Sequence, residues 1–187
     1  MRTVPFDAIV LTGGRGTRLG GVDKAEVVVG GKTLLARARA AVAGAAHTVV
    51  VGREVDGGPV AGVAAGLREL ADEAREGVAD VVLLLACDMP LVSTHTVTRL
   101  LREVNAAGDA DGVLLSDDTG RRQYLAGAYR TAALRDAVGS LGTTTGGSMR
   151  DLVAGLRLRE LAAHPEEAMD CDTWPDVDRA VRLLEER

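Results

Sequence analysis

The sequence is poor in the residues that mark several protein classes. Aromatic side chains make up only 2% of its 187 residues, so it has few of the anchors on which protein-interaction scaffolds depend. Its two cysteines, Cys87 and Cys171, are too few for a disulfide framework. Its three histidines lie far apart, without the spacing of zinc ligands. These shortages argue against a secreted disulfide scaffold and against a structural zinc site.

Basic charge and long apolar runs are scarce as well. The net charge is −5, which argues against a nucleic-acid partner, because phosphate-tracking surfaces usually carry a basic excess. The longest apolar run, residues 81–86, is far shorter than the roughly 20 residues of a membrane span. Residues 1–7 do not resemble a secretory signal. We therefore expect a cytoplasmic protein that binds neither membrane nor nucleic acid, with residues 1–187 forming one domain.

Apolar residues make up 47% of the chain and recur in an order that alternates strands with helices. Residues 81–86 form a continuous apolar run, and residues 7–11 and 47–51 are rich in apolar or β-branched side chains; all three have the length of buried parallel strands. Helical patterns follow these runs, beginning after Thr33 and reaching about residue 43, at Pro59, and at Ser93 or Thr94. This alternation is typical of a doubly wound α/β sheet.

The remaining segments predict smaller elements. Residues 25–29 are expected to form a short strand that turns at Gly30 and Gly31. The second half predicts an antiparallel pair around a polar stretch, two short helices, an edge strand and a C-terminal helix. These are expected at residues 113–115 and 124–129, after Thr131 and Ser148, at residues 156–161, and from Pro175. We expect this half to shape a substrate pocket.

The first strand runs into a loop that combines glycine with positive charge. Residues 12–24 contain five glycines together with Arg15, Arg18 and Lys24. Glycines let backbone amides approach a ligand closely, and fixed cations suit a polyphosphate. A solvated surface loop is the alternative. The position directly after a buried strand favours ligand binding.

Two common nucleotide-binding signatures are not met. A Walker A loop that ends at Gly31-Lys32-Thr33 would need glycine where Glu26 stands. A dinucleotide fingerprint that starts at Gly14 would need glycine where Leu19 stands. We therefore expect neither a P-loop NTPase nor an ordinary dinucleotide dehydrogenase.

Asp88 directly follows the strongest strand signal, in the segment Cys87-Asp88-Met89-Pro90. Parallel sheets present ligand-binding residues at the carboxyl ends of their strands, and Mg²⁺ usually takes one or two protein carboxylates with phosphate oxygens and water. A turn or helix-capping aspartate is the alternative; the phosphate-type loop favours the metal role. Strand alternation turns Cys87 away from the side that Asp88 faces, so both cysteines are expected to be buried packing residues.

Four segments together resemble the molybdenum cofactor guanylyltransferase family of nucleotidyltransferases. They are residues 11–24, which end in Gly-Gly-Val-Asp-Lys, and residues 58–62, 87–90 and 170–173, in the family's order. The resemblance spans nearly the whole chain. It implies a single-domain, three-layer α/β fold with a mostly parallel sheet, of the Rossmann-like nucleotide-diphospho-sugar transferase type.

The resemblance also implies roles for individual residues. Nucleotide binding would involve Leu11, Thr12, Gly13, Gly14, Lys24, Asp56 and Asp88. Arg18, Lys24 and Asp88 would be the catalytic residues, with Arg18 and Lys24 balancing phosphate charge. Asp88 would bind Mg²⁺ and Asp172 is the candidate second carboxylate. An equally open alternative is that Asp172 caps the last helix.

Three positions depart from the family's pattern. Thr12 replaces the usual alanine, Gly52 stands where asparagine is frequent, and Trp174 separates Thr173 from Pro175. For residues 121–123 we favour a solvated hairpin tip over a contact with the acceptor's phosphate.

The resemblance predicts transfer of GMP from GTP to molybdopterin, with release of pyrophosphate and Mg²⁺ as the cofactor. Proteins that insert the cofactor, or molybdoenzymes, are the implied partners. No general base is expected, because a phosphate nucleophile is already ionised at neutral pH. The alternatives are a cytidylyltransferase or another small-acceptor nucleotidyltransferase of the same fold, and a nucleotide-binding module without catalysis.

Overall fold

A mixed sheet forms the centre of the fold. The structure is a computed structural model that describes residues 4–13, 19–74 and 77–186. In sheet order the strands are β4 (Thr48–Val51), β1 (Asp7–Leu11), β5 (Val81–Ala86), β7 (Arg122–Arg130), β6 (Gly112–Ser116) and β8 (Leu158–Ala162). β4, β1 and β5 pair in parallel, as do β6 and β8. β7 runs antiparallel to both of its neighbours, β5 and β6.

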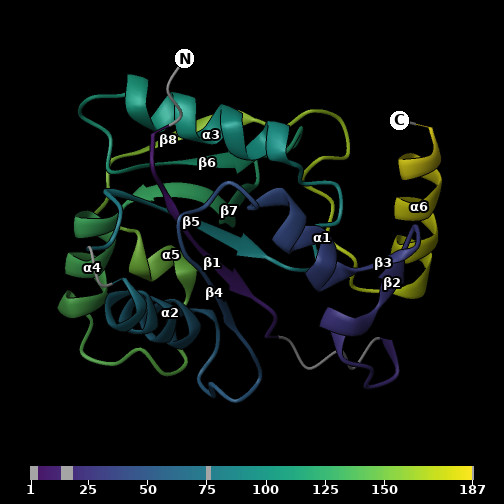
Figure 1. Ribbon diagram of the computed structural model, residues 1–187, viewed down its shortest axis with the longest axis horizontal. Coiled ribbons are helices and arrows are strands. Elements are labelled where there is room, and N and C mark those ends of the chain that lie inside the picture. Colours follow the sequence, from purple (N-terminus) through teal and green to yellow (C-terminus); the bar gives the residue numbers. More distant parts are fainter. Residues whose placement is uncertain (1–3, 14–18, 75–76, 187) are drawn as a thin grey trace.

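Helices cover both faces of this sheet and give the molecule three layers (Figure 1). One face carries α1 (Leu34–Ala41) and α3 (Thr94–Ala106), and the other carries α2 (Pro59–Glu73), α4 (Thr131–Ser140) and α5 (Met149–Leu152). The predicted α/β class with a mostly parallel sheet is thereby confirmed. In the described part of the chain, no helix has the length and apolar character needed to span a membrane.

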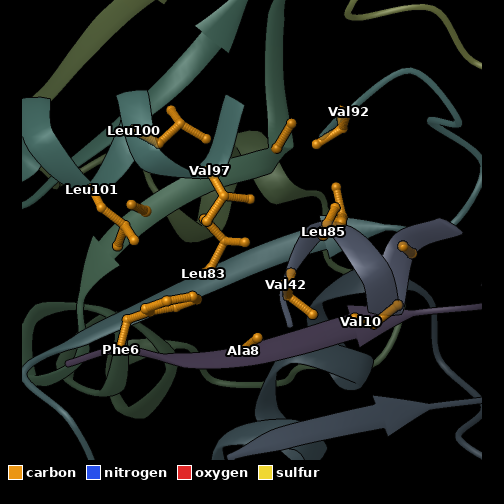
Figure 2. Close-up of a cluster of buried hydrophobic side chains, with 14 of the residues drawn as sticks. Phe6, Ala8, Val10, Val42, Leu83, Leu85, Val92, Val97, Leu100 and Leu101 are labelled. Atoms are coloured by element: carbon orange, nitrogen blue, oxygen red, sulfur yellow. The ribbon is translucent and has the colours of Figure 1, made fainter. Parts of the chain in front are cut away.

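Strand alternation divides the apolar core between the two faces of the sheet. Ala8 and Val10 of β1 belong to the cluster under α1 and α3, whereas Ile9 and Leu11 belong to the cluster under α2. Figure 2 shows side chains of the first cluster: Val97 of α3 points toward Leu83 of β5, and Val42, at the end of α1, lies beside Ala8 and Val10 of β1. Because the side-chain period of a strand is two, a shift of one residue would exchange the two faces.

A short hairpin and the C-terminal helix form a third apolar cluster beside the sheet. α6 (Trp174–Glu185) packs on β2 (Val28–Val29), which pairs antiparallel with β3 (Lys32–Thr33). In Figure 1 these elements lie together, away from β6 and β8. The connecting residues Gly30 and Gly31 have φ angles of 55° and 76°, as a tight two-residue hairpin turn requires.

The predicted strand over residues 25–29 is wrong in its first part. Lys24–Glu26 forms a 3₁₀ turn, η2, which begins when the carboxylate of Asp23 accepts a hydrogen bond from the amide of Ala25 at 3.0 Å. Local capping by Asp23 therefore overrides the β propensity of the apolar residues that follow. The consequence is that the side chain of Lys24 turns inward.

Most other predicted elements are confirmed with shifted ends. In the antiparallel pair, β6 ends at Ser116 and β7 begins at Arg122, so the polar connection is shorter than predicted. β8 lies at the edge of the sheet, as predicted. α1 ends at Ala41 rather than near residue 43, and α6 begins at Trp174 rather than at Pro175. The side chains of Thr33, Ser93 and Ser148 cap their helices.

The close packing of α2 on β1 generates a stability prediction. A Cβ atom added to Gly66 would lie 2.6 Å from Cγ2 of the buried side chain of Ile9. Gly66→Ala is therefore expected to destabilise the fold by about 1–3 kcal/mol, because the helix must move off the sheet. The matched control is Gly139→Ala in α4, where an added Cβ meets nothing within 4 Å, and it should be neutral or stabilising by up to about 1 kcal/mol. Urea unfolding measures both, and equal effects would contradict the packing argument.

The cysteines generate a prediction of chemical reactivity. Cys87 and Cys171 are 3% and 0% exposed. Burial raises the pKa of each thiol to about 12, and for Cys87 the negative charge of Asp88 adds to the effect. Since the thiolate is the reactive form, neither residue should react with iodoacetamide at pH 8 in the folded protein, whereas both should react in guanidinium chloride. Mass spectrometry measures how many thiols are alkylated. Rapid labelling of either cysteine in the folded protein would contradict the prediction, because it would show that this thiol is accessible.

Candidate functional site

The carboxyl ends of three neighbouring strands meet at one edge of the sheet. Leu11 at the end of β1 lies opposite Val51 of β4 and Ala86 of β5. The pairing continues past the strands, because the amide of Thr12 donates to the carbonyl of Val51 at 2.9 Å and the amide of Cys87 donates to that of Leu11 at 3.0 Å. The loops that follow β1, β4 and β5 therefore all start from this edge.

A cleft of about 1550 Å³ opens at the same edge. Its lining includes Leu11, Gly13, Gly52, Arg53, Asp56, Gly57, Gly58, Asp88, Arg121, Met149, Arg150, Asp170 and Asp172. Small-molecule sites commonly occupy about 300–1,000 Å³, so this cleft has room for more than one substrate.

Lys24 joins the carboxylates of Asp88 and Asp172. Its Nζ lies 2.9 Å from Oδ2 of Asp88 and also contacts the carboxylate of Asp172. The lysine side chain is only 10% exposed. Burial by itself lowers the pKa of Lys24, but the hydrogen bond to Asp172 and the charge of Asp88 outweigh that effect and raise the pKa. Lys24 is therefore a fixed positive charge.

A backbone hydrogen bond brings Asp172 to this place. The amide of Cys171 donates to the carbonyl of Asp88 at 2.8 Å, which holds the segment before α6 against the end of β5. Cys171 is fully buried, and its two flanking aspartates line the cleft. The alternative in which Asp172 caps the last helix is wrong, because the N-cap of α6 is Thr173. Thr173 supplies the hydroxyl that the capping box needs, and its amide donates to Asp176 at 2.8 Å.

Asp170 is a member of the site that the sequence reasoning missed. Burial and the charge of Asp88 raise the pKa of its carboxyl to about 6, although Arg121, 4.0 Å away, acts in the opposite direction. The sequence did carry a signal for it. Two aspartates that flank one buried residue in an extended segment project to the same side, so Asp170 follows from Asp172.

The carboxylates of Asp88 and Asp172 fit the requirements of Mg²⁺. Both converge on one cationic group, the ammonium of Lys24, and hard oxygen atoms are the donors that this ion prefers. Among the described residues, no group of three or more His, Cys, Asp or Glu side chains is arranged to hold a metal. A site with two protein carboxylates agrees with the habit of Mg²⁺ to keep phosphate oxygens and water as its other ligands.

Of the other residues predicted to contact the nucleotide, some line the cleft and one does not. Leu11, Gly13 and Asp56 line the cleft. Thr12 is buried and its hydroxyl donates to the carbonyl of Val51 at 3.3 Å, so its side chain serves the sheet. Gly14 and Arg18 lie outside the described residues.

Two of the departures from the family pattern have clear surroundings. The amide of Gly52 donates to Oε1 of Glu54 at 2.9 Å, and the carboxylate of Glu54 fills the space that a Cβ at position 52 would take. The side chain of Glu54 folds back and occupies the place that a side chain at position 52 would take. Trp174 is 51% exposed at the start of α6, so the inserted residue disturbs no core contact.

Comparison with known proteins places the chain among nucleotidyltransferases. Residues 8–162 match the model of the MobA-like NTP transferase domain. A molybdenum cofactor guanylyltransferase from Acidiphilium cryptum is 33% identical over 145 residues, which cover 67% of each chain. The protein of the same name from Pseudomonas putida is 38% identical over 117 residues, which cover 52% of this chain and 58% of that one.

Solved structures agree in fold. Molybdopterin-guanine dinucleotide biosynthesis protein A from Archaeoglobus fulgidus superposes with a TM-score of 0.73 at 19% identity, covering 97% of this chain and 100% of that one. A 2-C-methyl-D-erythritol 4-phosphate cytidylyltransferase from Thermus thermophilus gives 0.68 at 20% identity, with the same coverage. At these identities the likeness shows the fold alone. The match over residues 8–162 and the relative from Acidiphilium go further: the chain belongs to the MobA-like NTP transferase family of nucleotidyltransferases.

Proposed function

We propose that this chain transfers GMP from GTP to the terminal phosphate of molybdopterin and releases pyrophosphate, acting as a single cytoplasmic domain that hands its product to cofactor-inserting proteins or molybdoenzymes. The observation that carries the proposal is the junction of Lys24 with Asp88 and Asp172 at the edge of a cleft with room for two substrates. The names of the curated relatives supply the choice of nucleotide and acceptor.

The reaction needs positioning and charge balance rather than acid–base chemistry. An oxygen of the acceptor's phosphate attacks the α-phosphorus of GTP, and a new P–O bond forms. The bond from the α-phosphorus to the oxygen that bridges to the β-phosphate breaks, and its electron pair leaves with pyrophosphate. The attacking phosphate is ionised at neutral pH, so no side chain has to remove a proton. The principal barrier is the approach of two anionic groups.

Lys24 is the described residue best suited to lower that barrier. Its charge is held permanently beside the carboxylates at the end of β5, where it can balance the phosphate groups. Asp88 and Asp172 would hold Mg²⁺, which when bound neutralises phosphate oxygens. Arg18 is proposed from the sequence to add a second positive charge.

The remaining contacts position the nucleotide. Leu11, the last residue of β1, and Gly13, just after it, line the cleft, and Asp56 lines it beside the turn Gly57–Gly58 that leads into α2. The carbonyl of Gly57 accepts a hydrogen bond from the amide of Gly146 at 2.8 Å, which fixes this turn. We propose that the base and ribose lie between these two loops.

Cytidylyl transfer is the second candidate. The fold of the Thermus cytidylyltransferase covers 97% of this chain, and position 52 carries no side chain that could contact a base. The same junction of Lys24 with two carboxylates would serve either nucleotide, so the distinction depends on the base alone.

The first test removes the charges at the junction. Asp88→Asn and Lys24→Met should each lower kcat/KM for GTP-dependent transfer to molybdopterin by roughly 100-fold or more, because each removes a group that offsets phosphate charge. Pyrophosphate release measures the rate. Asp88→Asn should remain folded, since Lys24 keeps its contact with Asp172.

Matched controls exist for both changes. Lys32→Met on β3 and Asp136→Asn in α4 remove the same charges from exposed positions and should leave the rate within about twofold of the wild type. Wild-type activity in folded Asp88→Asn would remove this carboxylate from the mechanism.

The second test identifies the base. With Mg²⁺ present, GTP should raise Tm more than CTP or ATP at equal concentration. A tenfold preference corresponds to about 1.4 kcal/mol, which shifts Tm by about 3–5 °C in a chain of this size. Addition of EDTA should reduce the shift in Tm. EDTA removes Mg²⁺, and the negative triphosphate is then repelled by the carboxylates of Asp88 and Asp172. A larger shift with CTP would establish the cytidylyl alternative instead.

A further inference from the structure

The cleft has a second wall to which the proposed transfer gives no role. It is formed by β7, by α5 and by the chain that leads from α5 into β8. Apolar side chains cover much of this wall, namely those of Tyr124, Leu125, Met149, Val153, Leu156 and Leu158. One nucleotide does not fill about 1550 Å³, so this wall is available to the second substrate.

A rigid turn carries Arg121 to the rim of this wall. The carboxylate of Asp117 accepts hydrogen bonds from the amide of Arg121 at 2.9 Å and from the amide and hydroxyl of Thr119 at 3.0 and 2.7 Å. The carbonyl of Arg121 in turn accepts from the amide of Asp117 at 3.1 Å. Because these bonds close the turn on itself, the backbone of Arg121 is fixed before any ligand arrives.

Two adjacent arginines leave this turn and meet different partners. Arg122 donates to Oε1 of Glu160 on the edge strand β8 at 2.7 Å. Arg121 instead faces Asp170, with its Nη2 4.0 Å from the carboxylate Oδ2. Its guanidinium is therefore directed toward the cluster of carboxylates that contains Asp88 and Asp172.

The pair of Arg121 with Asp170 is loose. A separation of 4.0 Å is longer than a hydrogen bond, and the arginine side chain is 69% exposed whereas Asp170 is 29% exposed. A phosphate monoester offers a guanidinium two oxygens in bidentate geometry and carries more charge than one carboxylate. Such a group competes well for Arg121.

We propose that Arg121 binds the phosphate of the acceptor and that Asp170 holds the guanidinium when the acceptor is absent. The inference rests on the proposed function, because only a transferase with a phosphate-bearing acceptor needs such a contact. Arg121 brings the nucleophile past the carboxylates at the end of β5, which would otherwise repel it. The apolar wall beneath then lies beside the remainder of the acceptor.

Inorganic phosphate tests this inference without turnover. It is titrated calorimetrically into protein that is saturated with Mg²⁺ and a non-hydrolysable GTP analogue. Arg121→Gln should weaken phosphate binding by about tenfold or more. Asp170→Asn should strengthen it by about two- to fivefold, because it removes a half-buried carboxylate that competes for Arg121. Arg159→Gln on β8, which loses an exposed pair with Asp109, is the charge-matched control and should bind as the wild type does.

The opposite signs distinguish a binding role from a structural ion pair. Loss of a merely structural pair would move both variants in the same direction, and that result, or equal phosphate affinity in Arg121→Gln and the wild type, would overturn the inference. With molybdopterin as acceptor, Arg121→Gln should also raise KM for molybdopterin while KM for GTP stays within about twofold. Absence of wild-type turnover would instead count against the proposed function, and the phosphate titration would still decide the role of Arg121.

Discussion

The site depends on one buried cation that holds distant parts of the chain together. Lys24 contacts Asp88, 64 residues further along, and Asp172, 148 residues further along. Without this lysine, the carboxylates of Asp88, Asp170 and Asp172 would repel each other at one edge of the sheet. The lysine, in turn, could not be buried without these carboxylates. The same arrangement makes the site suitable for a metal–triphosphate, because it already combines converging oxygen ligands with a fixed positive charge. Structure and proposed chemistry therefore have the same electrostatic requirement.

This junction is built on the register of the sheet. β1, β4 and β5 end level with one another, and the amides of Thr12 and Cys87 extend the pairing by one residue. Asp88 thus faces the cleft just beyond the end of β5, while Cys87 remains in the core. The amide of Cys171 then adds the last segment to this edge through the carbonyl of Asp88. Backbone hydrogen bonds thus bring Asp88 and Asp172 to the same edge, where the side chain of Lys24 contacts both carboxylates.

Local sequence signals suffice for elements whose conformation depends on near neighbours along the chain. β1, β4 and β5 were predicted, because a parallel strand that is covered on both faces is mostly apolar along its length. The N-cap of α1 at Thr33 was predicted, and the start of α3 was narrowed to Ser93 or Thr94, because a hydroxyl before an apolar stripe satisfies free amides. The strand over residues 25–29 was mispredicted because the carboxylate of Asp23 closes a 3₁₀ turn that propensity does not reveal. The role of Thr173 as the cap of α6, in place of Asp172, likewise depends on the orientation of one hydroxyl.

The sequence by itself determined the α/β class, the position of Asp88 at the end of a central strand and the family to which the chain belongs, since each depends on residues that are close along the chain. Only the tertiary structure showed that Lys24 lies between Asp88 and Asp172, and that Arg121 faces Asp170 whereas Arg122 pairs with Glu160. These facts depend on contacts between segments that the sheet brings together. No local pattern encodes them, because charge pairing acts through space and not along the chain.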